Sequence, residues 1–186
     1  MKSELYLKYK KEVMPKLEEE FGIKNAMAVP TLKKIVVNAG IGNEYKNNTG
    51  IVEEMSQVLA QITGQRPSVI NSKLAISNFK LREGTPNGLK VTLRGDRMWE
   101  FFDKLVNIVF PRVKDFRGVN PKAFDGSGNY SVGIDDHTVF PEIDANNIKR
   151  VRSLEITIVT TAKTDKEGKI LLDKFGFPFK KDVNRG

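Results

Sequence analysis

Between positions 89 and 94 the sequence is Leu89-Lys90-Val91-Thr92-Leu93-Arg94. Apolar and polar residues alternate here without a break, and a period of two predicts a β-strand with one buried face and one face in water. Strands of this kind are typical of antiparallel sheets that carry a core on one side only. The dipeptide Asn87-Gly88 comes just before and favours a tight hairpin turn. We therefore expect residues 89–94 to pair with an extended segment at 68–81.

The rest of the chain supplies further strands and amphipathic helices around this hairpin. Strands are predicted at 32–38 and 153–161, and helices at 3–21 with a break at Pro15, 49–63, 96–109 and 164–175. Pro111 is expected to end the third helix. Glycines and prolines between 112 and 152 leave room only for short strands and long loops. The pattern predicts an α+β fold: a single domain over 1–180, mostly antiparallel sheet with helices packed on one face and long loops, and a disordered tail at 181–186.

The charge of the chain is positive and unevenly distributed. The formal net charge is +8, and the segment 65–97 holds seven basic residues against two acidic ones. A basic protein commonly binds nucleic acid, although a basic loop surface that is simply solvated is the alternative. The chain has no cysteine, which excludes disulfides, a thiolate nucleophile and zinc–sulfur sites. The charged N-terminal residues and the lack of a long apolar run predict an intracellular protein with no signal peptide and no contact with a membrane.

The polar face of the predicted sheet has a particular chemistry. Lys90, Thr92 and Arg94 share one face of their strand, and Lys73 is expected on the polar face of 68–77, opposite Ile70. Cationic and hydroxyl side chains contact phosphate, sugar and unstacked base edges. Alternation alone is uninformative, because any half-solvated antiparallel sheet shows it. The preference for cations over carboxylates is what indicates RNA.

Candidate catalytic and metal sites are weak by comparison. His137 is the only histidine and follows Asp135 and Asp136, so a Ser-His-Asp arrangement would have to use it. A functionless histidine in a surface loop is the better interpretation, and the acidic residues of 135–144 do not have the spacing of a calcium loop. Gly40-Ile41-Gly42 lacks the third glycine of a dinucleotide fingerprint. We predict no catalytic residue, no metal and no cofactor.

Three motifs carry a resemblance to a known family. They are Gln65-Arg66-Pro67, Asn78-Phe79-Lys80-Leu81-Arg82-Glu83-Gly84 and Val91-Thr92-Leu93-Arg94-Gly95. Segments 34–38, 140–143 and 155–162 agree as well, so the match is collinear over nearly the whole chain. The chain resembles the family of bacterial large-subunit ribosomal protein number five, which binds 5S ribosomal RNA.

The resemblance implies a structural role in the cytoplasmic ribosome, with three groups of contact residues. The expected partners are 5S rRNA, large-subunit rRNA, P-site tRNA, a small-subunit head protein across an intersubunit bridge, and neighbouring 5S-associated ribosomal proteins. The rRNA-binding positions that the resemblance implies are Asn38, Gln65, Thr92 and Arg94. The predicted polar face and the basic segment add Lys73, Lys90 and Arg66 to this set. The tRNA contact would use Asn78, Phe79, Lys80 and Arg82. The bridge would use Lys114, Arg117 and Asp144 from the glycine-rich region.

Three hypotheses follow. The first is a structural RNA-binding protein in which basic side chains neutralise phosphates and a preformed sheet recognises folded RNA. The second is a protein whose main task is protein–protein bridging through the long loops of 112–152, with RNA contact secondary. The third is an enzyme that uses His137 with neighbouring carboxylates.

Overall fold

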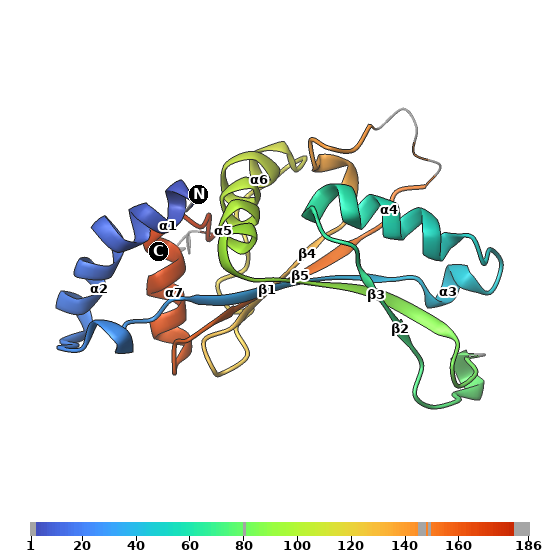
Figure 1. The fold of residues 1–186 in the computed structure, drawn as a ribbon, viewed down its shortest axis with the longest axis horizontal. Helices are drawn as coiled ribbons and strands as arrows, with labels where there is room; N and C mark the ends of the chain where they lie inside the picture. The colour runs from blue at the N-terminus through green and yellow to red at the C-terminus, as the bar shows by residue number, and fades with distance from the viewer. Residues whose placement is uncertain (1–2, 80, 145–147, 149, 181–186) are drawn as a thin grey trace, which may run out of the picture. The chain divides into compact units, whose positions relative to one another are not determined.

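The computed structural model describes residues 3–79, 81–144, 148 and 150–180. Five strands form one sheet in the order β2-β3-β1-β5-β4 (Figure 1). The strands are β1 Leu32–Gly40, β2 Ser68–Asn71, β3 Pro86–Leu93, β4 Tyr130–Ile134 and β5 Leu154–Thr160. A sheet of this kind with separate helices confirms the α+β prediction. The boundaries of the predicted domain stay a prediction, and the tail 181–186 lies outside the described residues.

The chain falls into two compact units, which we describe one at a time. Unit 1 consists of 1–35, 94–132 and 157–186, and unit 2 of 36–93 and 133–156. The helices of unit 1 are α1 Glu4–Lys8, α2 Met14–Phe21, α5 Gly95–Lys104, α6 Phe110–Arg112 and α7 Asp165–Lys174. Those of unit 2 are α3 Gly42–Tyr45 and α4 Ile51–Thr63.

Two π-helical turns of unit 1 explain how its helices pass a proline. Tyr9–Val13 joins α1 to α2, and Leu105–Val109 joins α5 to α6. A proline has no N–H to donate, and its ring clashes with the carbonyl four residues back, so a wider turn before it relieves the conflict. Helix α2 begins at Met14, with Pro15 in its first turn, and the predicted break at Pro15 is wrong because helical backbone runs without interruption from Glu4 to Phe21. The prediction that Pro111 ends its helix is wrong, because the helix continues through it to Arg112.

Aromatic rings fill much of the core of unit 1. Trp99 and Phe102 of α5 are 4% and 0% exposed. Phe175 lies 5.6 Å from Trp99 and 5.5 Å from Phe102 between ring centroids, which are normal distances for tilted and edge-to-face pairs. Thr164 caps the predicted last helix, which is α7, since its hydroxyl accepts a hydrogen bond from the N–H of Glu167.

Strand β3 organises the core of unit 2. Leu89, Val91 and Leu93 are buried, while Lys90 is exposed, so the predicted alternation is confirmed. Helix α4 packs against β3 (Figure 1). The helix contributes its own buried side chains to this core, namely Ile51, Met55, Leu59 and Ile62. One face of β3 therefore carries the core of unit 2 and the other is left for contacts.

The predicted hairpin exists, but its strands and its turn differ from the expectation. β2 pairs antiparallel with β3, with Ser68 opposite Lys90 and Ile70 opposite Gly88. The prediction of an extended segment at 68–81 is wrong beyond Asn71. Asn87-Gly88 lies inside β3 and not in the turn. A Cβ on Gly88 would lie only 3.3 Å from the carbonyl oxygen of Ala39, so the glycine is needed for close packing at this position. This glycine admits a neighbouring backbone instead of turning the chain.

Candidate nucleic-acid interface

The exposed face of β3 and β1 carries part of the predicted RNA-binding set. Lys90 is exposed, and Thr92 on the same face is half-buried. Asn38 of β1 is half-buried, and its Oδ1 would lie 3.7 Å from a Cβ placed on Gly88 of β3. Because side chains two residues apart on a strand share a face, Lys90 and Thr92 form a row that a folded RNA can approach from one side. A cation and a hydroxyl in such a row suit phosphate and sugar contacts.

Gln65 joins this group through the end of α4. The helix stops at Gly64, whose φ of 66° lies in the left-handed region that glycine adopts without strain. The Thr63 hydroxyl then donates to the carbonyl of Gln65 at 3.1 Å and accepts from its N–H at 3.3 Å. The Gln65 side chain donates to the backbone carbonyl of Thr92 at 3.4 Å. Gln65 and Thr92, 27 residues apart in sequence, are therefore in direct contact.

The remaining predicted rRNA-binding residues are exposed but less tightly grouped. Arg66 follows Gln65 and is exposed. Lys73 is exposed but lies beyond the end of β2, so the prediction that it sits on a strand face is wrong. The prediction that Ile70 points to the core is also wrong: it pairs with Gly88, on the face of Lys90, and is 39% exposed. Arg94 is exposed and belongs to unit 1, where it precedes α5.

Residues 72–85 form a closed extension of the β2–β3 hairpin. Ser72 donates to Thr85 at 2.9 Å near its base, and Ile76 and Leu81 exchange two hydrogen bonds further out. A 3₁₀ turn at Ser77–Phe79 forms the tip. The tip exposes large apolar side chains, with Leu74 71% and Phe79 66% accessible. Lys46, just after α3, donates to the Phe79 carbonyl.

The predicted tRNA-contact residues occupy this tip. Asn78, Phe79 and Arg82 are all exposed, and Lys80 lies outside the described residues. The predicted bridge residues are also at the surface. Lys114 and Arg117 are exposed in unit 1, and Asp144 is exposed in unit 2.

His137 contradicts its prediction as a surface-loop side chain. It is 1% exposed. Its backbone N–H donates to the Arg152 carbonyl at 3.1 Å, and its Nδ1 accepts the Arg152 N–H at 3.1 Å. Nδ1 also lies 3.2 Å from the Arg152 carbonyl oxygen, so backbone groups of Arg152 satisfy this side of the ring, while Nε2 has no partner within the described part of the chain. Burial lowers the pKa of His137, so the ring is neutral near pH 7.

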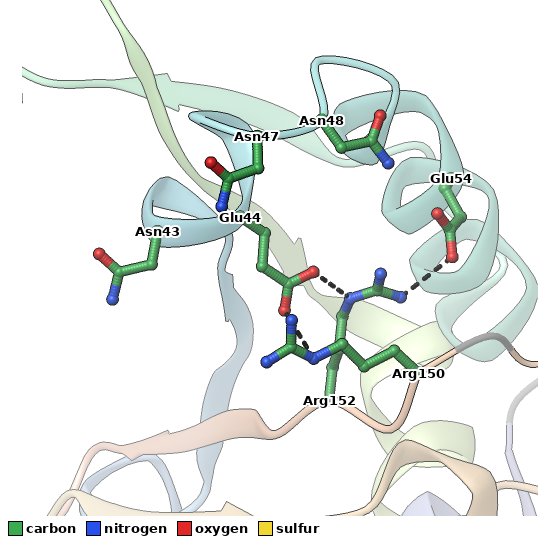
Figure 2. Close-up of a pocket in the computed structure, with 7 residues that line it drawn as sticks. All are labelled: Asn43, Glu44, Asn47, Asn48, Glu54, Arg150 and Arg152. Carbon is green, nitrogen blue, oxygen red and sulfur yellow. Dashed lines mark hydrogen bonds and ion pairs between the residues drawn. The ribbon is translucent and has the colours of Figure 1, made fainter.

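The same Arg152 is the centre of an ion-pair cluster that sequence reasoning missed. Its side chain is 10% exposed, and the guanidinium pairs with Glu44 through Nε at 3.0 Å and with Glu54 through Nη1 at 3.1 Å (Figure 2). Glu44 also pairs with Nε of Arg150 at 3.6 Å. The partners lie 98 and 108 residues from Arg152, so no local spacing could have revealed the cluster.

Among residues 3–144, 148 and 150–180, apart from Lys80, no three histidine or carboxylate side chains are grouped so that they could hold a metal ion. No described helix combines the length and the apolar character needed to cross a membrane.

Comparison with known proteins places this geometry in context. A family model described as "Ribosomal protein L5" matches residues 25–82, and one described as "ribosomal L5P family C-terminus" matches 86–179. The large ribosomal subunit protein uL5 of Natranaerobius thermophilus is 54% identical over 171 residues, covering 92% of this chain and 95% of that protein. The uL5 of Thermotoga maritima is 53% identical, covering 93% and 94%. That of Dictyoglomus turgidum is 55% identical, covering 94% and 97%.

Proposed function

This chain belongs to the ribosomal protein L5 family, and from that premise we propose that it attaches 5S rRNA to the large ribosomal subunit through the exposed face of β3 and β1. Membership makes it a structural constituent of the large subunit, with rRNA and other ribosomal components as partners and no enzymatic role. The hypothesis of an enzyme built on His137 is therefore wrong, and the buried ring agrees with that.

The observation that carries the proposal is the row of Lys90 and Thr92 beside Gln65. Lys90 and Thr92 lie on the side of β3 opposite the buried core, and the hydrogen bond from the Gln65 side chain to the Thr92 carbonyl fixes Gln65 next to this strand before RNA arrives. A preformed site loses less conformational entropy on binding than a flexible one. Lys90 supplies the charge that neutralises a phosphate, and the polar neighbours suit the 2′-hydroxyls and unstacked bases that distinguish folded RNA.

The test is a titration of the full chain with 5S rRNA over a salt series, with tRNA and duplex DNA as competitors. Lys90→Glu should weaken binding about tenfold or more, because one charged contact is lost. The slope of the logarithm of the binding constant against the logarithm of the salt concentration should become shallower by about one, the contribution of one phosphate contact. Lys169→Glu, an equal charge change on exposed α7, is the control and should have a much smaller effect. Equal losses of 5S rRNA affinity in both variants would mean that only the net charge of the chain matters, and would refute the assignment of Lys90 to the RNA-binding face.

We further propose that the 72–85 extension contacts P-site tRNA. Its tip is held by its own hydrogen bonds, and it combines the exposed ring of Phe79 with the exposed cation Arg82. An aromatic ring can stack on a base while an arginine contacts the neighbouring phosphate. Phe79→Ala should lower the affinity of reconstituted ribosomes for P-site tRNA and leave 5S rRNA binding intact.

The bridging hypothesis supplies a second candidate function, contact with a small-subunit head protein. Its support is the exposed loop that follows α6, where Lys114 and Arg117 project from irregular backbone. Lys114→Glu together with Arg117→Glu should impair subunit joining and spare 5S rRNA binding. Loss of RNA binding in this variant would contradict the division of tasks.

A further inference from the structure

Unit 2 contains a polar pocket whose residues have no role in the proposed function. It has a volume of about 410 Å³ and lies between α3, the start of α4 and the segment that leads into β5 (Figure 2). Three asparagines, Asn43, Asn47 and Asn48, line it together with the Arg152 cluster. The volume falls within the range of small-molecule sites, and the lining residues are all polar or charged, although their carbon atoms make up most of the surface that they present to the pocket.

The charged part of the pocket is rigid and electrically balanced. Arg152 is held by Glu44 and Glu54 at 3.0 and 3.1 Å, and Glu44 also holds Arg150. Two guanidinium groups thus face two carboxylates, so the lining has no net charge. A free phosphate or a metal ion would gain little net attraction from such a lining. The ion pairs instead fix the pocket wall, which leaves it preorganised for a ligand.

The groups that can contact a ligand are the asparagine amides and the exposed guanidinium of Arg150, whose Nε pairs with Glu44. Among the described residues, Asn43 and Asn47 make no side-chain hydrogen bond, and both are exposed. Asn48 accepts the Gly50 N–H through Oδ1 at 3.0 Å, which directs its NH₂ group away from the helix start. The Arg150 side chain is 69% exposed. Amides offer donors and acceptors side by side, as the edge of a nucleobase does, and an exposed guanidinium can contact a phosphate or stack on a base.

We propose that this pocket holds one unpaired nucleotide of ribosomal RNA, with its base against the asparagine amides and its phosphate beside Arg150. The inference rests on the RNA-binding character of the family but not on the sheet-face site, since it shares no residue with Gln65, Lys90 or Thr92. An unpaired nucleotide fits because only a base outside a helix offers its whole edge to a pocket. The same chemistry would accept a nucleotide of 5S rRNA or of large-subunit rRNA, and the experiment separates them.

The test compares reconstituted large subunits carrying the full chain or its variants, with base-specific chemical probing of both rRNAs. Asn43→Ala combined with Asn47→Ala leaves the Arg152 cluster intact and should make one or two protected, unpaired nucleotides about fivefold more reactive, the effect of losing a neutral hydrogen bond. Asn107→Ala, on an exposed surface of unit 1, is the matched control and should change nothing. Unchanged reactivity at every nucleotide with the double variant would overturn the proposal.

A second measurement does not depend on the affinity of a variant. Because the chain has no cysteine, Asn47→Cys introduces a unique thiol that can carry an iron chelate for directed hydroxyl-radical cleavage. Cleavage centred on an unpaired nucleotide, in the RNA strand whose reactivity changed, is the expected result. Cleavage no stronger than that from Asn107→Cys would refute the pocket. Lys90→Glu should alter 5S rRNA binding in either case, so failure of the pocket and failure of the sheet-face proposal are distinguishable.

Discussion

Replacement of Arg152 by methionine is the sharpest test of what stabilises unit 2. Arg152→Met keeps most of the aliphatic stem and removes the guanidinium. It thereby removes two ion pairs at 3.0 and 3.1 Å, made by a side chain that is only 10% exposed. Glu44 and Glu54 then lose their strongest partner, and Glu44 keeps only Arg150 at 3.6 Å.

The magnitude follows from how deeply each partner is buried. Removing one member of a fully buried ion pair costs about 3–5 kcal/mol, because the other charge stays behind without compensation. Here the carboxylate side chains are 26% and 35% exposed, so water can solvate them in part. We therefore expect a loss of about 2 kcal/mol in the free energy of unfolding, or about 4–8 °C in Tm for a chain of this size.

Equilibrium unfolding in urea, followed by far-ultraviolet circular dichroism at pH 7, measures this loss. Arg150→Met is the matched control: it lies two residues away and shares Glu44, but its side chain is 69% exposed and its pair is longer. It should cost about 0.5 kcal/mol or less. A loss below about 0.5 kcal/mol for Arg152→Met, or equal losses for the two variants, would refute the assignment of a buried, stabilising cluster.

Two further predictions concern packing and pH. Gly168→Ala should destabilise the protein by about 1–3 kcal/mol in urea unfolding, since its Cβ would lie 2.6 Å from the Gly128 carbonyl oxygen. A Cβ on Gly133 meets nothing within 4 Å, so Gly133→Ala is the control and should be nearly neutral. Similar losses of stability in the two variants would contradict the steric explanation. Burial lowers the pKa of His137, so the unfolded chain takes up the proton first as pH falls, and stability should decline from about pH 6.5 downward. His137→Asn, which keeps an acceptor for the Arg152 N–H, should flatten that decline in urea midpoints measured from pH 7.5 to 5, and parallel profiles would exclude His137 as its source.

Local patterns predicted the elements that local physics determines. The alternation in 89–94 identified β3 because successive side chains of a strand point to opposite faces, so a strand with one buried face alternates apolar and polar residues. The helix that ends at Gly64 was predicted because its apolar spacing and its left-handed cap are both local. The extended segment at 68–81 failed because its backbone closes on itself through hydrogen bonds such as that between Ile76 and Leu81.

Long-range contacts account for what the sequence did not reveal. Asn87-Gly88 has the composition of a turn, but its glycine serves the close approach of Ala39 from a neighbouring strand. His137 is flanked by polar residues and looked exposed, yet backbone groups of Arg152 satisfy one side of its ring. Both outcomes depend on partners distant in sequence, which no window of local residues contains. The pairing of Gln65 with Thr92 belongs to the same class, although the resemblance had named both residues.

Helix α4 connects the cluster that stabilises unit 2 to the sheet-face site that we propose binds 5S rRNA, with one at each end. Glu54, in its first turns, joins the Arg152 cluster, whereas Gln65 follows its last residue and is held locally by Thr63 and by the Thr92 carbonyl. Loss of the cluster should therefore lower the free energy of unfolding without moving Gln65 relative to β3. On this reasoning Arg152→Met should weaken 5S rRNA binding no more than Asn43→Ala combined with Asn47→Ala does, wherever it remains folded. Lys90→Glu should instead keep the free energy of unfolding and weaken 5S rRNA binding about tenfold. Loss of both properties in Arg152→Met, measured below its Tm, would mean that α4 transmits strain from one end to the other.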